Sequence, residues 1–387
     1  MDFALTPPQL DLQRRAHDFA AREIAPGAAA RDQAEAVDRR LFIRLAEQGW
    51  MGALWPTTLG GSALTYLDLA LIGEQIAGAC LSTAIALAIH TCLASMSIYE
   101  AGDDAQRQRW MRLLASGGAL GAFALTEPDA GSDPGGLSAT LTRAGDRLIL
   151  NGVKTWVSNA GLAEAFVVFA SHDLTQRHRA ITALVIEAGT PGLALGLREA
   201  TLGLRAADIR TVTFENVVVA PDAVLGRLGD GWPIILRAFD RVRVVLAAAA
   251  LGAAAGAVAL GVEYASTRRQ FGTQIGYKQA VQAYLAESQM EVEALRGLVY
   301  RAAWLADRGE PFGLAGAQAK AFGARVANAV ADRMLQVHGG AGFNEALPIA
   351  RVYRDVRALR LLGGTDEIQR YVVARALLEP HGVRIQP

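Results

Sequence analysis

Apolar residues recur at helical spacing along the first third of the chain. This spacing predicts helices between residues 8 and 116, with a loop at 55–61. Residues 83–99 are apolar nearly all round, so we expect this helix to be buried on most of its sides. The first part of the chain is therefore predicted to be an all-α domain covering residues 1–118.

After Gly121 the pattern changes from helical spacing to alternation of apolar and polar positions. Runs separated by Gly, Asp and Asn turns predict strands at 137–143, 147–151, 166–170, 181–186 and 211–217. Short strands at this spacing favour a small antiparallel β-barrel over a parallel sheet. The predicted barrel domain covers residues 119–228.

Helical spacing returns at Trp232. It predicts helices at 233–269, 277–308, 312–337, 346–358 and 366–378. The loops between them are short, as an antiparallel bundle requires. The predicted fold class is therefore α+β: a helical domain, a barrel, and a helical bundle over residues 229–387.

Composition and charge narrow the classes of partner. Hydrophobic residues make up 52% of the chain, and 38 Lys and Arg balance 38 Asp and Glu. Zero net charge without a long basic run argues against nucleic acid as a partner. Both cysteines, Cys80 and Cys92, lie in apolar helical sequence, so we expect reduced core thiols.

The stretch from Val244 to Val262 is apolar without a break, and a membrane span has to be considered. It consists mostly of Ala and Gly, which favour lipid far less than Leu or Ile do. Small residues let helices approach closely, so we expect the central helix of a soluble bundle. The start, Met1-Asp2-Phe3, lacks the basic residues of a signal peptide, and a cytoplasmic protein without membrane insertion is expected.

The candidate chemistry begins at Phe123-Ala-Leu125-Thr126-Glu127-Pro128-Asp129-Ala-Gly131-Ser132-Asp133. Later segments are Trp156-Val-Ser158, Arg268-Arg-Gln-Phe271-Gly, and Gln336-Val-His-Gly339-Gly340. Trp156 offers a flat apolar wall, the hydroxyls offer hydrogen bonds, and an arginine suits a pyrophosphate. Taken alone, Trp156 is more simply explained as a strand residue in a barrel core.

In this order and spacing, the segments resemble the acyl-CoA dehydrogenase flavoprotein family from Met1 to about Leu378. The resemblance implies the same domain order, with four main helices in the C-terminal bundle, and FAD as the cofactor. It implies that Phe123, Leu125, Thr126, Trp156 and Ser158 line the flavin, and that Ser132 reaches the FAD phosphates. It places Thr365 and Glu367 near FAD as well.

The resemblance also implies a second subunit at the site. Residues matching Arg268 and Phe271 contact the FAD of a neighbouring subunit, and those matching Gln336, Gly339 and Gly340 meet the adenosine end of FAD across a subunit boundary. A homodimer or homotetramer is therefore expected. The implied reaction is α,β-desaturation of an acyl thioester of coenzyme A or a carrier protein, with Asp240 and Arg243 at the pantetheine and an electron-transfer flavoprotein as acceptor.

Other classes of site find no support in the sequence. No G-x-G-x-x-G lies between a strand and a helix, so a nicotinamide site is not indicated. No His, Cys and carboxylate set has the spacing of metal ligands. Ser132 is not in a G-x-S-x-G elbow.

The chain departs from the family pattern where a base is needed. Removal of the proton α to a thioester carbonyl calls for a positioned carboxylate. Gly363 stands where most of the family has Glu, and Val242 stands at the alternative Glu position on the central helix. Asp240 lies about 200° of helical rotation from Val242 and is expected to point elsewhere. His90 and Glu100 are candidates by elimination, although His90 is more simply a core histidine.

Three functions remain open from the sequence. The chain is a dehydrogenase with its base elsewhere, a flavin-dependent oxygenase that needs a reductase partner, or a base-lacking subunit of a hetero-oligomer. A binding protein without flavin is disfavoured by the intact flavin segments. The acyl chain length depends on the packing of residues such as Leu93, Ser95 and Leu362.

Overall fold

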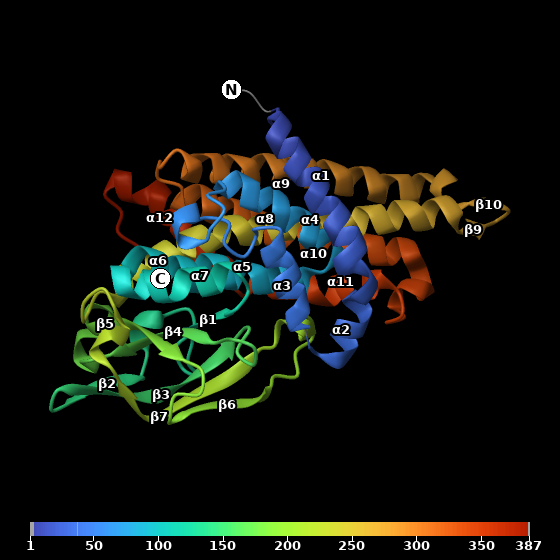
Figure 1. Cartoon of the computed structure of the whole chain (residues 1–387). Coiled ribbons are helices and arrows are strands. Elements are labelled where there is room, and N and C mark those ends of the chain that lie inside the picture. Colours follow the sequence, from blue (N-terminus) through green and yellow to red (C-terminus); the bar gives the residue numbers. More distant parts are fainter. Residues whose placement is uncertain (1–3, 37, 386–387) are drawn as a thin grey trace.

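The computed structural model describes residues 4–36 and 38–385. The helices from both ends of the chain pack against one another, and the sheet lies against one side of them (Figure 1). The helices of the first part pack into the shared core through residues such as Leu45, Leu69 and Ile72. Their bounds are α1 Pro7–Phe19, α2 Ala28–Ala34, α3 Arg39–Glu47, α4 Tyr66–Ala79, α5 Leu81–Ala88, α6 Met96–Ala101 and α7 Asp104–Ala115. A π-helical segment, Ile89–Ser95, joins α5 to α6.

The middle of the chain forms a sheet of eight strands in the order β6-β7-β3-β2-β4-β5-β8, with β1 beside β4. All strand pairs are antiparallel except β1 with β4 and β2 with β4. A second core of alternating side chains, including Leu150, Phe166 and Phe214, lies inside the sheet. The bounds are β1 Gly121–Ala124, β2 Thr140–Ala144, β3 Arg147–Val157, β4 Ala165–Ser171, β5 Ile181–Glu187, β6 Leu193–Arg198, β7 Arg210–Val219 and β8 Val224–Leu225.

The C-terminal part contains the long helices that the apolar spacing predicts. They are α8 Gly231–Thr267, α9 Gln279–Asp307, α10 Gly313–His338, α11 Pro348–Val356 and α12 Asp366–Leu378. A short hairpin of β9 (Arg269–Gln270) and β10 (Thr273–Gln274) follows α8. The hairpin extends from the body of the molecule at the far end from the sheet (Figure 1).

Helix α8 crosses α4 at glycines. A β-carbon at Gly252 would lie 2.0 Å from the carbonyl oxygen of Glu74, and one at Gly256 would lie 2.6 Å from the carbonyl oxygen of Gly78. Only a residue without a side chain permits this approach. The small residues of α8 therefore let its backbone touch the backbone of α4. This contact joins the N-terminal helices to the C-terminal helices.

Two stretches, Leu81–Ala101 and Gly231–Thr267, have the length and composition of a membrane-crossing helix. In their most apolar windows, 94% and 78% of the residues are buried inside the fold. A core helix meets the same criteria, and burial of this extent agrees with the expected central helix of a bundle. Cys80 and Cys92 are free thiols in the core, as predicted.

Candidate active site

The loop that follows β1 is held by hydrogen bonds from β3. The Leu125 carbonyl oxygen accepts a hydrogen bond from Lys154 Nζ (3.1 Å). The Thr126 carbonyl oxygen accepts one from the backbone N–H of Thr155 (2.8 Å). Two of the predicted flavin-lining residues therefore sit directly beside the end of β3 that carries Trp156.

Trp156 is turned outward by an irregularity in its strand. The pairing of β3 with β7 shifts register between Lys154 and Val157, and Trp156 has a φ of +58°. A bulge of this kind re-aims a side chain. Val157 is buried, whereas 60% of Trp156 is exposed. Trp156 is therefore not a barrel-core residue, and its indole is a flat apolar wall beside Thr126 that fits an isoalloxazine ring.

The end of β3 is fastened to two other elements. Asn159 follows Ser158 and has a φ of +65°. Its amide nitrogen donates to the carbonyl oxygens of Ala86 (3.0 Å) and Gly121 (3.3 Å). The partly exposed Ser158 is therefore held in place next to helix α5 and strand β1.

One turn of α8 reaches the same region. The ring of Phe239 lies 6.4 Å from the ring of Phe123, centroid to centroid. The guanidinium of Arg243 lies 5.9 Å from the Phe239 ring centroid and donates a hydrogen bond to Asp240 (3.1 Å). The predicted flavin wall and the predicted pantetheine residues therefore meet through two phenylalanines.

The two expected base positions face each other, and both are apolar. A β-carbon at Gly363 would lie 2.4 Å from Leu246 Cδ1 and 4.0 Å from Val242 Cγ1. Val242 and Leu246 are buried. A side chain at Gly363 would therefore collide with Leu246 at its β-carbon, and the nearest side chains to that point, Leu246 and Val242, are both apolar.

His90 is a core residue that joins β1 to the π-helical segment. Its ring is fully buried, and Nδ1 accepts a hydrogen bond from the backbone N–H of Gly121 (3.0 Å). Burial lowers the pKa of His90 to about 4, so the imidazole is neutral near pH 7. A weakly basic ring with this fixed structural bond does not suit the abstraction of an α proton.

Glu100 forms ion pairs with two arginines from α8. Its carboxylate pairs with Arg241 and lies 3.3 Å from Arg237 Nε. These arginines lie on a different side of α8 from Val242 and Leu246, because each residue adds about 100° of rotation. Glu100 therefore belongs to the packing of α6 on α8.

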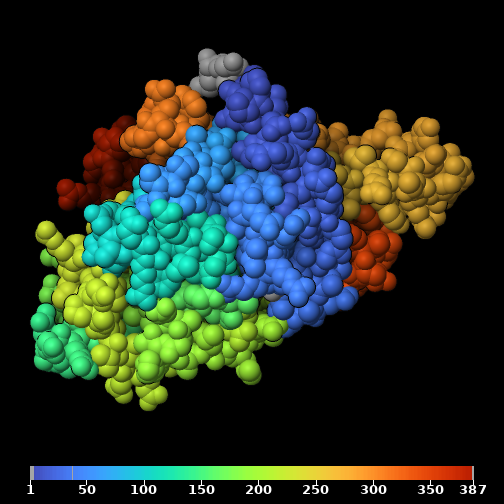
Figure 2. All heavy atoms as spheres, viewed as in Figure 1, coloured from blue at the N-terminus to red at the C-terminus, as the bar shows by residue number. Residues whose placement is uncertain are grey.

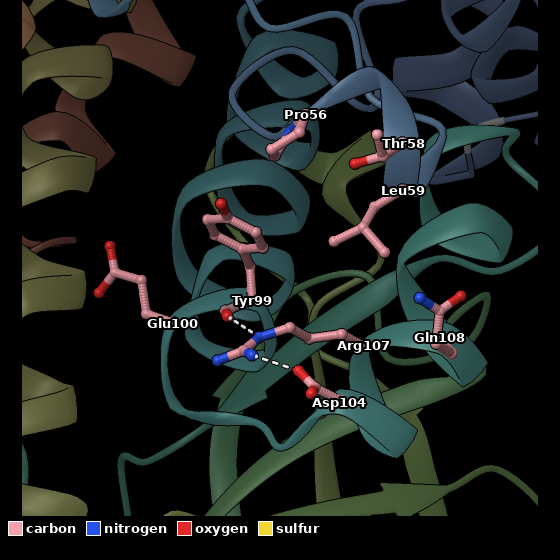
Figure 3. A pocket seen from close by; sticks show the side chains of 8 residues that line it. All are labelled: Pro56, Thr58, Leu59, Tyr99, Glu100, Asp104, Arg107 and Gln108. Carbon is pink, nitrogen blue, oxygen red and sulfur yellow. Dashed lines mark hydrogen bonds and ion pairs between the residues drawn. The ribbon is translucent and has the colours of Figure 1, made fainter.

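A pocket of about 590 Å³ borders Glu100, between the 56–59 turn, the end of α6 and α7. Figure 3 shows Glu100 directed away from Arg107, which instead donates to Asp104 (2.9 Å) and to the Tyr99 carbonyl oxygen (2.7 Å). Polar and mutually paired side chains are not the lining that an acyl chain requires. This pocket does not contain any of the residues predicted to bind FAD or thioester.

Asp240, a residue of α8, packs against the start of α10 and not at the base position. A β-carbon at Gly313, the first residue of α10, would be 2.9 Å from its carboxylate. Burial raises the pKa of Asp240, although the charge of Arg243 opposes this shift. Arg243 keeps a buried Nε without a hydrogen-bond partner in the structure. The pair is available to polar groups of a ligand that passes along this turn.

The turn before α12 is fixed through its carbonyl groups. The Gly364 carbonyl oxygen accepts from Lys320 Nζ (2.6 Å) and from Gln369 Nε2 (2.9 Å). Thr365 caps the helix by accepting from the N–H of Ile368, and Glu367 is exposed in the first turn. A rigid turn holds Gly363 against α8, while Thr365 and Glu367 stay at the helix start.

The remaining predicted FAD residues lie at the opposite end of the bundle. Arg268 ends α8, and the hairpin tip carries Phe271, which is 94% exposed. The stretch of Gln336, Gly339 and Gly340 ends α10 near the same place, since the rings of Tyr264 and His338 stack at 4.4 Å. Figures 1 and 2 show the hairpin projecting far from the sheet that carries Trp156. A single chain therefore does not bring the two groups together.

Three buried residues of this region were not singled out from the sequence. Lys154 and Glu127 form a buried ion pair under the β1 loop, and Leu246 fills the base position. A lysine at an inward position of an alternating strand was the available signal for Lys154. The sequence offered no such signal for Leu246, because the residues around it in α8 are apolar as well. Among the residues described, no cluster of three His, Cys, Asp or Glu could hold a metal ion.

Comparison with known proteins gives one consistent family. The models for the N-terminal, middle and C-terminal domains of acyl-CoA dehydrogenase match residues 6–118, 122–217 and 229–378. A probable acyl-CoA dehydrogenase, YngJ of Bacillus subtilis, is 36% identical over 98% of this chain and 100% of its own.

Solved structures agree with the sequence matches. Butyryl-CoA dehydrogenase from Megasphaera elsdenii superposes with a TM-score of 0.95 at 36% identity, covering 98% of this chain and 100% of that one. A chain from the work on the electron transferring flavoprotein of Acidaminococcus fermentans superposes with a TM-score of 0.96 at 36% identity and the same coverage.

Proposed function

The chain belongs to the acyl-CoA dehydrogenase family, and from this premise we propose how its residues carry out the reaction. It is an FAD-dependent oxidoreductase that acts on the CH–CH bond of an acyl thioester. When bound, FAD supplies the acceptor for the hydride that leaves the β carbon. The proposals below concern the site, the proton and the partners.

The flavin ring is proposed to lie against Trp156, in the space bordered by Phe123, Leu125, Thr126 and Ser158. The contact between Phe123 and Phe239 is the observation that carries this proposal. The contact sets Phe123 beside Phe239, which lies one helical turn before Val242 on α8, and this supports a flavin next to the proposed thioester site.

The thioester is proposed to lie between α8 and the turn at Gly363. Arg243 and Asp240 hold polar groups of the pantetheine, as the unpartnered Nε of Arg243 supports. Val242 and Leu246 border the α carbon. Val242 and Leu246 orient the acyl group, but neither of these two side chains can accept a proton.

The apolar base position favours a second candidate function. A chain that binds FAD and thioester without a carboxylate at the α carbon suits the base-lacking subunit of a hetero-oligomer, whose partner chain carries the Glu. In the first function, the α proton leaves to a base outside the Gly363–Val242 position.

The assembly and the electron acceptor complete the proposal. Because Arg268 and Phe271 lie far from Trp156, we assign their FAD contacts to a second copy of the chain, in a homodimer or a homotetramer. An electron-transfer flavoprotein in the cytoplasm is the proposed acceptor, supported by the structural likeness to the Acidaminococcus chain.

The experiment is an anaerobic titration of the FAD-loaded protein. Short-, medium- and branched-chain acyl-CoA thioesters are added, and the oxidised-flavin absorbance is followed. Bleaching by one or more thioesters, with the enoyl product detected by mass spectrometry, is the expected result. Trp156→Ala is the matched control, and it is expected to weaken FAD binding.

Two other results would replace the first function. If the flavin stays oxidised with every thioester but bleaches after a Glu-bearing homologous chain is co-purified, the subunit function holds. If thioesters never bleach it, while oxygen is consumed once a reductase has reduced the flavin, the chain is an oxygenase.

A further inference from the structure

The loop from Glu127 to Ser138 is closed by the side chain of its own first residue. Glu127 Oε2 accepts hydrogen bonds from the N–H of Ser138 (2.5 Å) and from its hydroxyl (2.6 Å). Oε1 accepts from the N–H of Ala139 (2.9 Å). Backbone bonds between Glu127 and Ala130 also form a tight turn. Ser132, the predicted phosphate contact, is exposed within this closed loop.

Lys154 attaches the same carboxylate to strand β3. Its ammonium lies 2.6 Å from Glu127 Oε1 and 3.1 Å from the carbonyl oxygen of Leu125. The side chains of Lys154 and Glu127 are 0% and 2% exposed. The neighbouring Thr155 binds Thr126, and Trp156 follows at the bulge. One buried ion pair thus connects the ring side of the predicted flavin site to its phosphate side.

The pair is unusual because burial of two charges is costly. An apolar pair of similar size often gives a fold equal or greater stability. Here an apolar pair would leave the N–H groups of Ser138 and Ala139 and the carbonyl of Leu125 without partners. Burial lowers the pKa of Lys154 to about 8. Burial alone would raise the pKa of Glu127, but the charge of Lys154 and the bonds from Ser138 hold that pKa below its usual range.

We propose that Lys154 and Glu127 are positioning residues for FAD, which fix Thr126 and Trp156 and, through the closed loop, Ser132 at the spacing that the cofactor requires. The proposal rests on the flavin site assigned above. It concerns the shape of the loop, since neither charged group is exposed to touch the cofactor. Breaking the pair should loosen both halves of the FAD contact together.

The test compares FAD binding with folding stability in matched variants. Lys154→Met, Glu127→Gln and the double variant are stripped of FAD. For each, the FAD dissociation constant and the thermal midpoint of the apoprotein are measured. The control is Glu74→Gln, which breaks the ion pair between the buried carboxylate of Glu74 on α4 and the partly exposed Arg296 on α9.

We expect FAD affinity to fall roughly tenfold or more in both single variants, the size of losing one or two charge-assisted hydrogen bonds. The double variant leaves no unpaired buried charge, so its thermal midpoint should lie above those of the single variants, while its FAD affinity stays low. Glu74→Gln should lower the midpoint and leave the affinity unchanged. The visible circular dichroism of bound flavin should change in the Lys154 and Glu127 variants only.

Unchanged FAD affinity in the double variant would overturn the proposal, as would an equal loss in Glu74→Gln. Failure of the proposed function would give different experimental results. A wild-type protein that binds no FAD contradicts the flavin site, and a protein that binds FAD but is not bleached by thioesters contradicts the reaction. The positioning test reads only affinity and spectrum, so it stands apart from the reaction.

Discussion

At the scale of single residues, Gly363 and Leu246 decide what chemistry the cleft permits. Gly363 has a φ of +68°, where side chains other than glycine are disfavoured, and Leu246 occupies the volume beside it. A carboxylate at position 363 would therefore not be enough to restore the base, because the side chain of Leu246 is packed where the new side chain would begin.

Restoring the base should need two substitutions. Gly363→Glu alone is expected to cost about 1–2 kcal/mol of stability from its left-handed backbone and to gain little desaturation, because Leu246 Cδ1 blocks the new side chain. Gly363→Glu with Leu246→Ala should gain thioester-dependent bleaching. Anaerobic stopped-flow absorbance measures both, and Leu246→Ala alone is the control. A single variant as active as the double one would show that Leu246 yields easily.

Sequence reasoning located the base problem but not its packing. Gly363 and Val242 were identified by register, and the structure brings them to one spot. The role of Trp156 as a flat wall for the flavin stays a prediction, and its outward direction depends on a bulge against β7 that no local pattern reveals. His90 was weighed as a base or a core residue, and burial explains the second choice.

At the scale of elements, α11 is fastened to the loop between β6 and β7. Asp355 accepts a hydrogen bond from the N–H of Leu204 (2.7 Å), and a β-carbon at Gly203 would lie 2.5 Å from the Arg354 carbonyl. Burial raises the pKa of Asp355 to about 6. This junction is one of the places where the sheet is held to the C-terminal helices.

The junction should make stability depend on pH. The pKa of Asp355 in the folded protein lies above its unfolded value of 3.8. The free energy of unfolding that the protonated carboxyl contributes is therefore fully present below about pH 4, and it is lost as pH rises through 6. The shift corresponds to about 3 kcal/mol. Asp355→Asn keeps the acceptor for Leu204 and should flatten this part of the profile.

Denaturant unfolding between pH 4 and 7 measures the difference between the two proteins. Asp11→Asn, at a half-exposed carboxylate of α1, is the control and should follow the wild type. Parallel profiles for wild type and Asp355→Asn would rule out the titration of Asp355 as the cause.

Long elements were predictable from the sequence, and short ones were not. The expected helix at 233–269 is observed at Gly231–Thr267, and that at 366–378 at Asp366–Leu378, because long apolar periodicity leaves few alternatives. Strands β1, β6 and β8 and the hairpin of β9 and β10 were missed. The residues of β6 and of the hairpin are largely exposed, so no buried face imposes alternation on them, whereas β1 is only four residues long and buried throughout, so it shows no alternation either.

At the scale of the whole molecule, the predicted FAD residues form two groups at opposite ends of the chain's long axis. Trp156 lies on β3 and Thr126 in the loop after β1, whereas Arg268 and Phe271 lie at the hairpin of β9 and β10, at the far end from the sheet (Figure 1). The apolar pattern predicts each helix, but it contains no information on which exposed residues meet another copy. That part of the prediction came from the family resemblance.

Mixed oligomers can test whether the FAD site is divided between two subunits. A chain with Trp156→Ala is refolded together with a chain carrying Arg268→Ala. If the site spans two subunits, a mixed dimer contains one wild-type site and one doubly altered site. We therefore expect half of the sites in mixed dimers to bind FAD tightly, whereas each variant alone loses roughly tenfold or more in affinity.

Isothermal titration of the purified mixed dimer, isolated by two affinity tags, counts the tight sites. If none is found, the residues act within one chain, and the assignment across subunits is wrong. A mixture of exposed-surface variants Leu10→Asp and Leu113→Asp is the control for refolding, and all of its sites should remain tight.

The loop closed by Glu127 also has a consequence for the order in which parts of the protein fold during synthesis. The bonds of Glu127 join residues 12 and 27 positions apart, whereas the Glu74–Arg296 bond that links α4 to α9 spans 222 positions. Contacts between residues near in sequence form faster and need less of the chain. During synthesis, the loop closed by Glu127 can form once β3 has left the ribosome, and the sheet-side half of the flavin site is complete once β7, against which the bulge at Trp156 forms, has followed. The helix α8 and the hairpin arrive later, so the half-site is a template on which the rest of the enzyme assembles.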